Sequence, residues 1–259
     1  MLPNTKPLTT QGDLSAEMVA GIDRFLIGET ERSVKGRPAH WEPDFSSQAA
    51  YEKSLEPNRW RFRQCLGAVD ERVPLTALEF VGSSDAKVTG TETYTIQAVR
   101  WPVFEGVFGE GLLLEPNARP VARVIAVPDA DQTPEMIAGL APGLAPEFQF
   151  ARRLAENGCQ VLVPMLISRQ DTWSGNGALK RFTNQPHREW IYRQAFEMGR
   201  HIIGYEVQKI LAAADWLARE NGSSPAQAKA SPVPIGLVGY AEGGLLALYS
   251  AALDRKSVV

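Results

Sequence analysis

The sequence has few cysteines, little net charge and no long apolar run, and each of these absences excludes a class of protein. Its two cysteines, Cys65 and Cys159, are too few for a disulfide framework and lie in no CxxC or Cys/His cluster, so we predict no metal site and no cofactor. The formal net charge is only −3, which provides no basic footprint for nucleic acid. No stretch reaches the ~18 apolar residues of a membrane span. With 44% hydrophobic and 22% charged residues, the composition is that of an ordinary globular protein.

The N-terminal stretch Met1–Asp13 also lacks the apolar core of a signal peptide. We therefore expect a cytoplasmic location if Met1 is the true start, and an exported precursor if the true start lies upstream. Nothing in the sequence specifies an oligomeric state.

The first 75 residues are predicted to form a helical extension. From Leu14 to Gly28, apolar residues recur at helical spacing, which indicates an amphipathic helix. The following stretch, Arg37–Asp70, is polar and contains prolines, which favours short helices and loops. Its aromatic residues are expected to pack for burial rather than to bind ligands; they are Trp41, Tyr51, Trp60 and Phe62.

Residues 76–253 are predicted to form an α/β domain. Short β-branched or aromatic runs predict strands at 77–81, 93–99, 106–115, 122–127, 159–163 and 235–238. Helices are predicted at 148–156, at 188–220 as one long helix, and from Gly243 onward, with a polar loop at 168–186. Strands that alternate with helices after an antiparallel start predict a mostly parallel sheet with helices on both faces.

The most informative motif follows the last predicted strand. Gly239-Tyr240-Ala241-Glu242-Gly243 has the strand, sharp turn and helix of a G-x-S-x-G nucleophile elbow, but its centre is Ala241. An alanine methyl cannot attack a carbonyl or form an acyl intermediate. A phosphate-binding glycine turn fits less well, since no P-loop lysine and no G-x-G-x-x-G spacing is present. A close-packed strand–helix turn without chemistry remains the third interpretation.

Together with the runs Val124–Glu135 and His187–His201, this motif resembles α/β-hydrolases of the acetyl-xylan-esterase-like and dienelactone-hydrolase-like kinds, over roughly residues 59–253. The resemblance implies that Ala241 occupies the nucleophile position. It also implies oxyanion-hole donors from the backbone N–H of Glu242 and from the loop that contains Ala130 and Asp131.

In this family the acid and the histidine follow the nucleophile in the chain. The three histidines, His40, His187 and His201, all precede Ala241, so none can be the triad histidine. His201 is expected to form a structural cluster with Glu197 and Tyr205 on the long helix.

The last residues, 254–259, are predicted to be a non-native tail. They form a polar hexamer that a common sequencing-adapter oligonucleotide encodes in one frame, and the alternative is a genuine short tail. We therefore expect a C-terminally truncated α/β-hydrolase domain, in which the apolar strand 235–238 lies at an exposed edge of the sheet.

The ligand side is predicted in the polar loop and the helix after it. The loop leaves the carboxyl end of a strand, where open α/β sheets place their ligands. Arg169, Trp173 and Arg188 are the candidate substrate-binding residues, and a solvated loop with surface ion pairs is the alternative.

Two classes of function follow. One is a carboxylic-ester hydrolase lineage, acting on a small-molecule or saccharide ester, in which this chain is inactive because of Ala241. The other is a non-catalytic ligand-binding or interaction protein on the same fold.

Overall fold

A computed structural model describes residues 3–82, 87–170, 173–176, 178, 180–220 and 231–254 of the 259-residue chain. The chain divides into two compact units, Met1–Asn58 and Arg59–Val259. The first unit contains α1 (Leu14–Gly36), a 3-10 turn (Arg37–His40), α2 (Gln48–Ser54) and the start of α3 (Glu56–Leu66).

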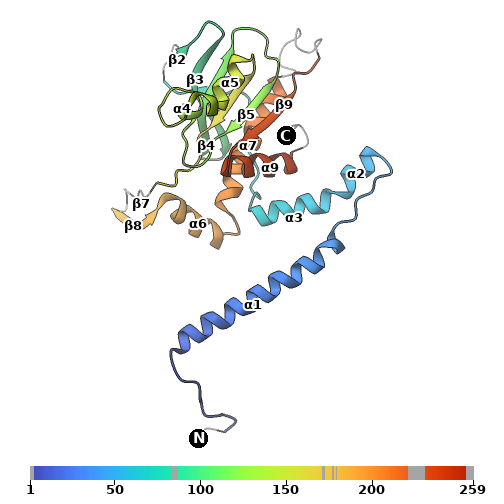
Figure 1. The fold of residues 1–259 in the computed structure, drawn as a ribbon, viewed down its shortest axis with the longest axis vertical. Helices are drawn as coiled ribbons and strands as arrows, with labels where there is room; N and C mark the ends of the chain where they lie inside the picture. Colours follow the sequence, from blue (N-terminus) through green and yellow to red (C-terminus); the bar gives the residue numbers. More distant parts are fainter. Residues whose placement is uncertain are drawn as a thin grey trace. The chain divides into compact units, whose positions relative to one another are not determined.

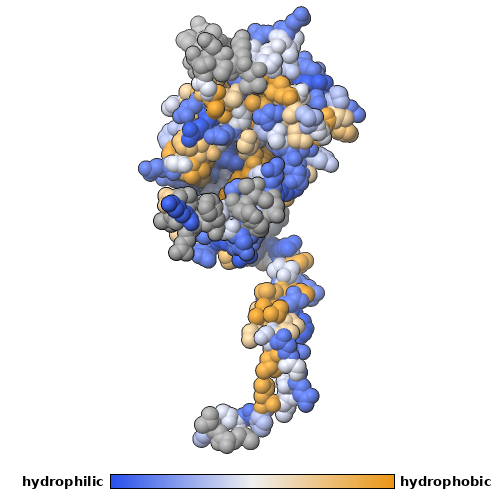
Figure 2. Space-filling view, turned by 90° about the vertical axis from the view of Figure 1, so that its left-hand side faces the viewer, coloured by the Kyte–Doolittle hydropathy of each residue, from blue (hydrophilic) through white to orange (hydrophobic). Residues whose placement is uncertain are grey.

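Helix α1 is the amphipathic helix that the spacing predicts, but it continues to Gly36 instead of ending near Gly28. Asp13 caps its start, since the carboxylate accepts from the N–H groups of Ser15 and Ala16 at 2.8 and 3.3 Å. Its apolar side chains are exposed and gather along one side of the helix (Figure 2); they include Met18, Ile22, Phe25 and Leu26.

The second unit begins earlier than the sequence predicts. The expected boundary is residue 75, but Leu66, Ala68 and Leu75 are buried in the core of the second unit. The aromatic residues of this segment also differ from one another. Phe62 packs edge-on against Tyr249 with ring centroids 5.1 Å apart, whereas Trp60 is 64% exposed, so the predicted packing role is wrong for Trp60.

A seven-stranded sheet forms the centre of the second unit, in the order β1-β3-β4-β6-β5-β9 with β2 paired to β3 (Figure 1). The strands are β1 (Glu79–Phe80), β2 (Lys87–Gly90), β3 (Tyr94–Phe104), β4 (Val107–Pro116), β5 (Arg123–Val127), β6 (Gln160–Pro164) and β9 (Ile235–Gly239). Strands β1 to β4 pair antiparallel, as does β4 with β6, while β6, β5 and β9 run parallel. The α/β prediction is confirmed, but the sheet is mixed rather than mostly parallel, because among the described strands only β6, β5 and β9 run parallel.

Helices cover both faces of the sheet (Figure 1). Because successive residues of a strand point to opposite faces, Ile125 and Val127 of β5 pack with α7 (Ile202–Glu220) and α9 (Glu242–Leu253), while Val124 and Ala126 face the other way. That second face is covered by α4 (Pro134–Ile137) and α5 (Phe150–Glu156), the latter preceded by a 3-10 turn (Pro146–Phe148).

Two predictions between β6 and β9 are wrong. The expected helix 188–220 is two helices, α6 (His187–Glu197) and α7, because Gly199 adopts a positive φ of 67° between them. The expected loop 168–186 contains a two-stranded antiparallel sheet of β7 (Trp173–Asn176) and β8 (Arg181–Pro186). Both strands consist mostly of polar residues without apolar alternation, so the sequence carries no strand signal for this hairpin.

Strand β9 is the last strand in the sheet order, as expected. Ile235 and Leu237 are nevertheless buried against α7 and α9, and Val238 is 39% exposed. Residues 255–259 of the predicted tail lie outside the described residues. None of the described helices is both long and apolar enough to cross a membrane.

Candidate functional site

The turn between β9 and α9 has the backbone of a nucleophile elbow. Ala241 adopts φ 49° and ψ −117°, a conformation that costs a non-glycine residue about 1–3 kcal/mol. A Cβ atom on Gly239 would lie 2.2 Å from the carbonyl oxygen of Gly243, and a Cβ on Gly243 would lie 2.2 Å from the carbonyl oxygen of Val127. The two glycines therefore allow the backbone to pack this tightly, and Ala241 carries the strain at the centre.

The first backbone N–H of α9 is already occupied. The N–H of Glu242, the oxyanion-hole donor that the resemblance implies, donates to Oδ1 of Asp129 at 3.1 Å. Asp129 begins the loop that follows β5, and its own carbonyl accepts from the N–H of Gln132 at 2.9 Å. A carboxylate of the protein thus lies where an oxyanion would accept this hydrogen bond.

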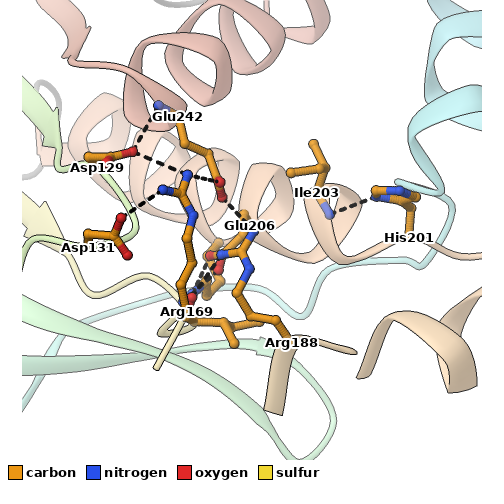
Figure 3. Close-up of polar contacts among 10 residues, drawn as sticks. Asp129, Asp131, Arg169, Arg188, His201, Ile203, Glu206 and Glu242 are labelled. Atoms are coloured by element: carbon orange, nitrogen blue, oxygen red, sulfur yellow. Dashed lines mark hydrogen bonds and ion pairs between the residues drawn. The ribbon is translucent and has the colours of Figure 1, made fainter. Parts of the chain in front are cut away.

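Arg169 joins the two halves of the site (Figure 3). Arg169 lies in the segment that follows β6. Its guanidinium contacts three carboxylates, at 2.6 Å from Oε2 of Glu242, 3.0 Å from Oδ2 of Asp131 and 3.4 Å from Oδ1 of Asp129 (Figure 3). Its hydrogen bond to Glu242 is the main cause that raises the pKa of Arg169, so the guanidinium stays charged. Arg169 thereby connects the start of α9 with the loop after β5.

Arg188, the second residue of α6, binds Glu242 from another direction. Its Nη2 lies 2.7 Å from Oε1 of Glu242, and its Nη1 donates to the carbonyl of Ile167 at 2.8 Å. The side chain of Glu242 is only 12% exposed and each of its oxygens has an arginine partner. We call Asp129, Asp131, Arg169, Arg188 and Glu242 the elbow cluster.

A buried ion pair on α7 binds the backbone of residues 165–167, the segment between β6 and Arg169. Glu206 of α7 is fully buried, and its Oε1 accepts from the N–H of Ile167 at 2.7 Å. Nζ of Lys209 lies 2.5 Å from Oε2 of Glu206 and donates to the carbonyl of Met165 at 2.9 Å. These contacts fix the chain as it leaves β6, which in turn places Arg169.

Two cavities adjoin the turn. One, of about 210 Å³, is lined by the predicted oxyanion loop and by residues after β6; its lining includes Ala130, Asp131, Leu166 and Ser168. The other, of about 430 Å³, is mainly apolar and lined by Gln132, Leu144, Glu147, Phe148, Phe150 and Tyr240. Tyr240 directly precedes Ala241, so the larger cavity opens beside the elbow.

The candidate residues from the sequence are brought together in part. Ala241, Glu242, Asp131, Arg169 and Arg188 meet at the elbow, and Ala130 lines the smaller cavity. Trp173 begins β7, and its side chain lies outside the described part of the structure. The two arginines contact carboxylates of the protein, which is the ion-pair alternative that the sequence left open.

Sequence reasoning missed Asp129, Glu206 and Lys209. Asp129 lies in the loop that was singled out, but only its backbone was considered. Glu206 and Lys209 lie one turn apart on a helix, a spacing that also describes an ordinary solvated pair, so the sequence carried no signal of their burial.

Two of the three histidines, His187 and His201, have structural partners. Nδ1 of His187 lies 2.6 Å from the hydroxyl oxygen of the buried Ser174, which joins α6 to β7. His201 precedes α7 rather than lying within a helix. Its Nδ1 accepts from the N–H of Ile203 at 3.0 Å, and its ring packs edge-on against Tyr192. The expected cluster with Glu197 and Tyr205 is therefore wrong.

Comparisons with known proteins add information on the fold. The chain matches no family described by a sequence profile, and no curated protein matches it. Among solved structures, it resembles a presumed acetyl xylan esterase from Bacteroides fragilis NCTC 9343 at 17% identity and a TM-score of 0.54, covering 84% of this chain and 54% of the other.

Two further structures are more distant. They are acetyl xylan esterase 1 from Thermoanaerobacterium sp. JW/SL YS485, at 13% identity and TM-score 0.45, and a glucuronoyl esterase from Solibacter usitatus, at 14% and 0.49. The matches cover 78% and 82% of this chain, and 55% and 58% of the others.

The chain has an α/β-hydrolase fold. It spans little more than half the length of the solved structures it resembles. At these identities the likeness concerns the α/β-hydrolase fold, and the chemistry has to be argued from the residues of the elbow cluster.

Proposed function

We propose that this chain comes from a carboxylic-ester hydrolase lineage and that its elbow site binds a ligand without hydrolysing it. The observation that carries the proposal is Ala241 in the strained backbone of an elbow. In a serine hydrolase this conformation exposes the nucleophile. The strained backbone at Ala241 costs conformational energy, but the alanine side chain has no reactive group. We expect this combination where an ancestral nucleophile has been replaced by alanine.

The contact between Asp129 and Glu242 supports loss of catalysis independently. A hydrolase stabilises negative charge that develops on the substrate oxygen with backbone N–H donors. Here the Glu242 N–H is held by a carboxylate at 3.1 Å, and that negative charge opposes a second one at the same place. Catalysis would therefore need a nucleophile, a general base to activate it and the withdrawal of Asp129.

The cavity beside the elbow supports a ligand with an apolar or ring-shaped group. It combines the aromatic side chains of Phe148, Phe150 and Tyr240 with the polar groups of Gln132 and Glu147, the mixture typical of small-molecule sites. We propose a small-molecule or saccharide ester as the ligand, by analogy with the presumed acetyl xylan esterase from Bacteroides fragilis. In this proposal Arg169 and Arg188 position Glu242 at the site. Trp173, the first residue of β7, remains a candidate substrate-binding residue, as predicted from the sequence.

The first test concerns catalysis. We expect the wild type to hydrolyse 4-nitrophenyl acetate no faster than the matched control Ala241→Gly, since neither has a nucleophile at this position. We expect Ala241→Ser to remain within about tenfold of that background, because each tenfold requires about 1.4 kcal/mol of transition-state stabilisation that Asp129 opposes. A gain of more than a hundredfold in Ala241→Ser would favour the alternative, a site still arranged for ester hydrolysis.

The second test concerns binding. We expect an acetylated xylo-oligosaccharide to bind the wild type in calorimetric titration, and Tyr240→Ala to weaken binding at least about fivefold, since ring contacts contribute about 1 kcal/mol. Phe80→Ala is the control, because Phe80 is also an exposed aromatic residue but lies on β1. Absence of binding to the wild type, or equal losses in both variants, would contradict the proposed ligand.

A further inference from the structure

A third cavity lies between α7 and the segment that joins α3 to β1. It has a volume of about 420 Å³ and shares no lining residue with the elbow cluster. Its lining comprises Arg63 of α3, the segment Asp70–Leu75, and Ala212, Asp215 and Arg219 of α7. We call it the arginine cavity.

The arginine cavity has an apolar floor and charged walls. Leu75 and Ala212 are buried members of the core below it. On α7, the spacing of Ala212, Asp215 and Arg219 places all three on one face of the helix, which turns the charged pair toward the segment from α3. A rigid floor with charged side chains around it is suited to a small polar ligand.

Two of the acids on its walls are already neutralised. Oδ2 of Asp215 lies 2.8 Å from Nη2 of Arg72. Asp70 receives several contacts from the guanidinium of Arg200, between 2.5 and 3.0 Å. The carboxylates of Asp70 and Asp215 are therefore paired with arginines of the protein.

Positive charge and donor capacity are left over. Among the described residues, neither Arg63 nor Arg219 has a carboxylate within ion-pair distance. Arg219 donates to the carbonyl of Leu75, which carries no full charge. Partial burial, and after it the positive charge of Arg72, lower the pKa of Arg63.

We propose that the arginine cavity binds a small oxyanion, a phosphate or carboxylate group, at the guanidinium groups of Arg63 and Arg219. An oxyanion would supply a counter-charge to Arg63 and Arg219, which line the same cavity. The guanidinium group is suited to this task because its planar N–H donors match the oxygens of phosphate and carboxylate. Glu71 is the remaining acid of the lining, and its charge opposes the ligand.

The test is calorimetric titration of the full chain with inorganic phosphate and, separately, with citrate, at low and constant ionic strength. We expect saturable binding of at least one anion, and the preferred anion distinguishes a phosphate ligand from a carboxylate ligand. Arg63→Gln should weaken binding at least about tenfold, because it removes charge-assisted hydrogen bonds. Arg63→Lys should restore part of the affinity, and Glu71→Gln should tighten binding about threefold by removing a nearby like charge.

Arg193→Gln is the matched control, since Arg193 is an exposed arginine of α6 paired with Glu189. It should leave anion binding unchanged. Absence of saturable binding for both anions would overturn the proposal, as would equal losses in Arg63→Gln and Arg193→Gln or weaker binding in Glu71→Gln. Because the elbow cluster is not involved, Ala241→Ser should bind the anion as the wild type does, whatever the outcome of the hydrolysis and oligosaccharide tests.

Discussion

The elbow cluster and the arginine cavity both combine arginines with acidic side chains, but they differ in how completely the charges are paired. At the elbow, both oxygens of Glu242 and the guanidinium groups of Arg169 and Arg188 have partners, and even the Glu242 N–H is taken by Asp129. In the arginine cavity, Arg63 and Arg219 have no carboxylate partner among the described residues.

The difference separates polar networks whose charges are paired within the protein from surfaces that keep unpaired charges for an anion. A saturated network stabilises the backbone around it and offers few donors to an incoming anion. An unsaturated one retains donors whose desolvation is compensated only when an anion binds. The location of a site at the ends of the parallel strands does not by itself determine whether its polar network is saturated or unsaturated.

The largest effect should come from the backbone beneath the elbow cluster. We expect Gly243→Ala to lower the free energy of unfolding by about 3 kcal/mol, because the new Cβ would lie 2.2 Å from a backbone oxygen of Val127. Thermal and chemical denaturation would measure it. Gly244→Ala is the control, since its Cβ would lie 3.3 Å from the carbonyl oxygen of Gly239, a much smaller overlap. Equal stability of the two variants would show that the turn is looser than described.

Charge removal within the elbow cluster should have an intermediate effect. Glu242→Gln weakens the contacts to Arg169 and Arg188, and we expect a loss of about 2 kcal/mol in unfolding free energy. Glu189→Gln breaks an exposed pair on α6 and should cost less than about 0.5 kcal/mol. If both variants unfold at the same denaturant concentration, the elbow cluster is no more than a set of surface ion pairs.

The smallest effect should be a gain. Ala241→Gly relieves the positive φ of 49°, and we expect the unfolding free energy to rise by about 1 kcal/mol. Gly21→Ala, an open helical position in α1, provides a comparison in which the opposite replacement should be favourable by propensity. Destabilisation by Ala241→Gly would mean that the alanine methyl packs usefully, and that strain at the elbow is not stored in this residue.

Much of the fold follows from local patterns. Buried strands such as β5 and β6 appear as short apolar runs, and the elbow appears as glycines around a strand–helix junction. The break between α6 and α7 escaped prediction because the apolar stripe continues across it, although Gly199 was visible. The β7–β8 hairpin escaped because polar strands without alternation look like a loop.

The site was predictable in its backbone and only partly in its side chains. The positions of Ala241 and Glu242 follow from the motif, but the occupation of the Glu242 N–H by Asp129 does not. Nor does the sequence show that Arg63 and Arg219 line one cavity, because the two residues lie far apart in the chain.

By itself, the sequence determined that the chain forms an α/β fold and that the centre of its elbow carries no nucleophile, because strand patterns, glycine positions and the chemistry of one residue are local properties. Only the tertiary structure decided which charges are paired. Ion pairs join residues far apart in the chain, such as Arg169 with Glu242 and Arg72 with Asp215, and their distances are set by packing of the sheet and helices. That packing leaves the elbow saturated and the arginine cavity open.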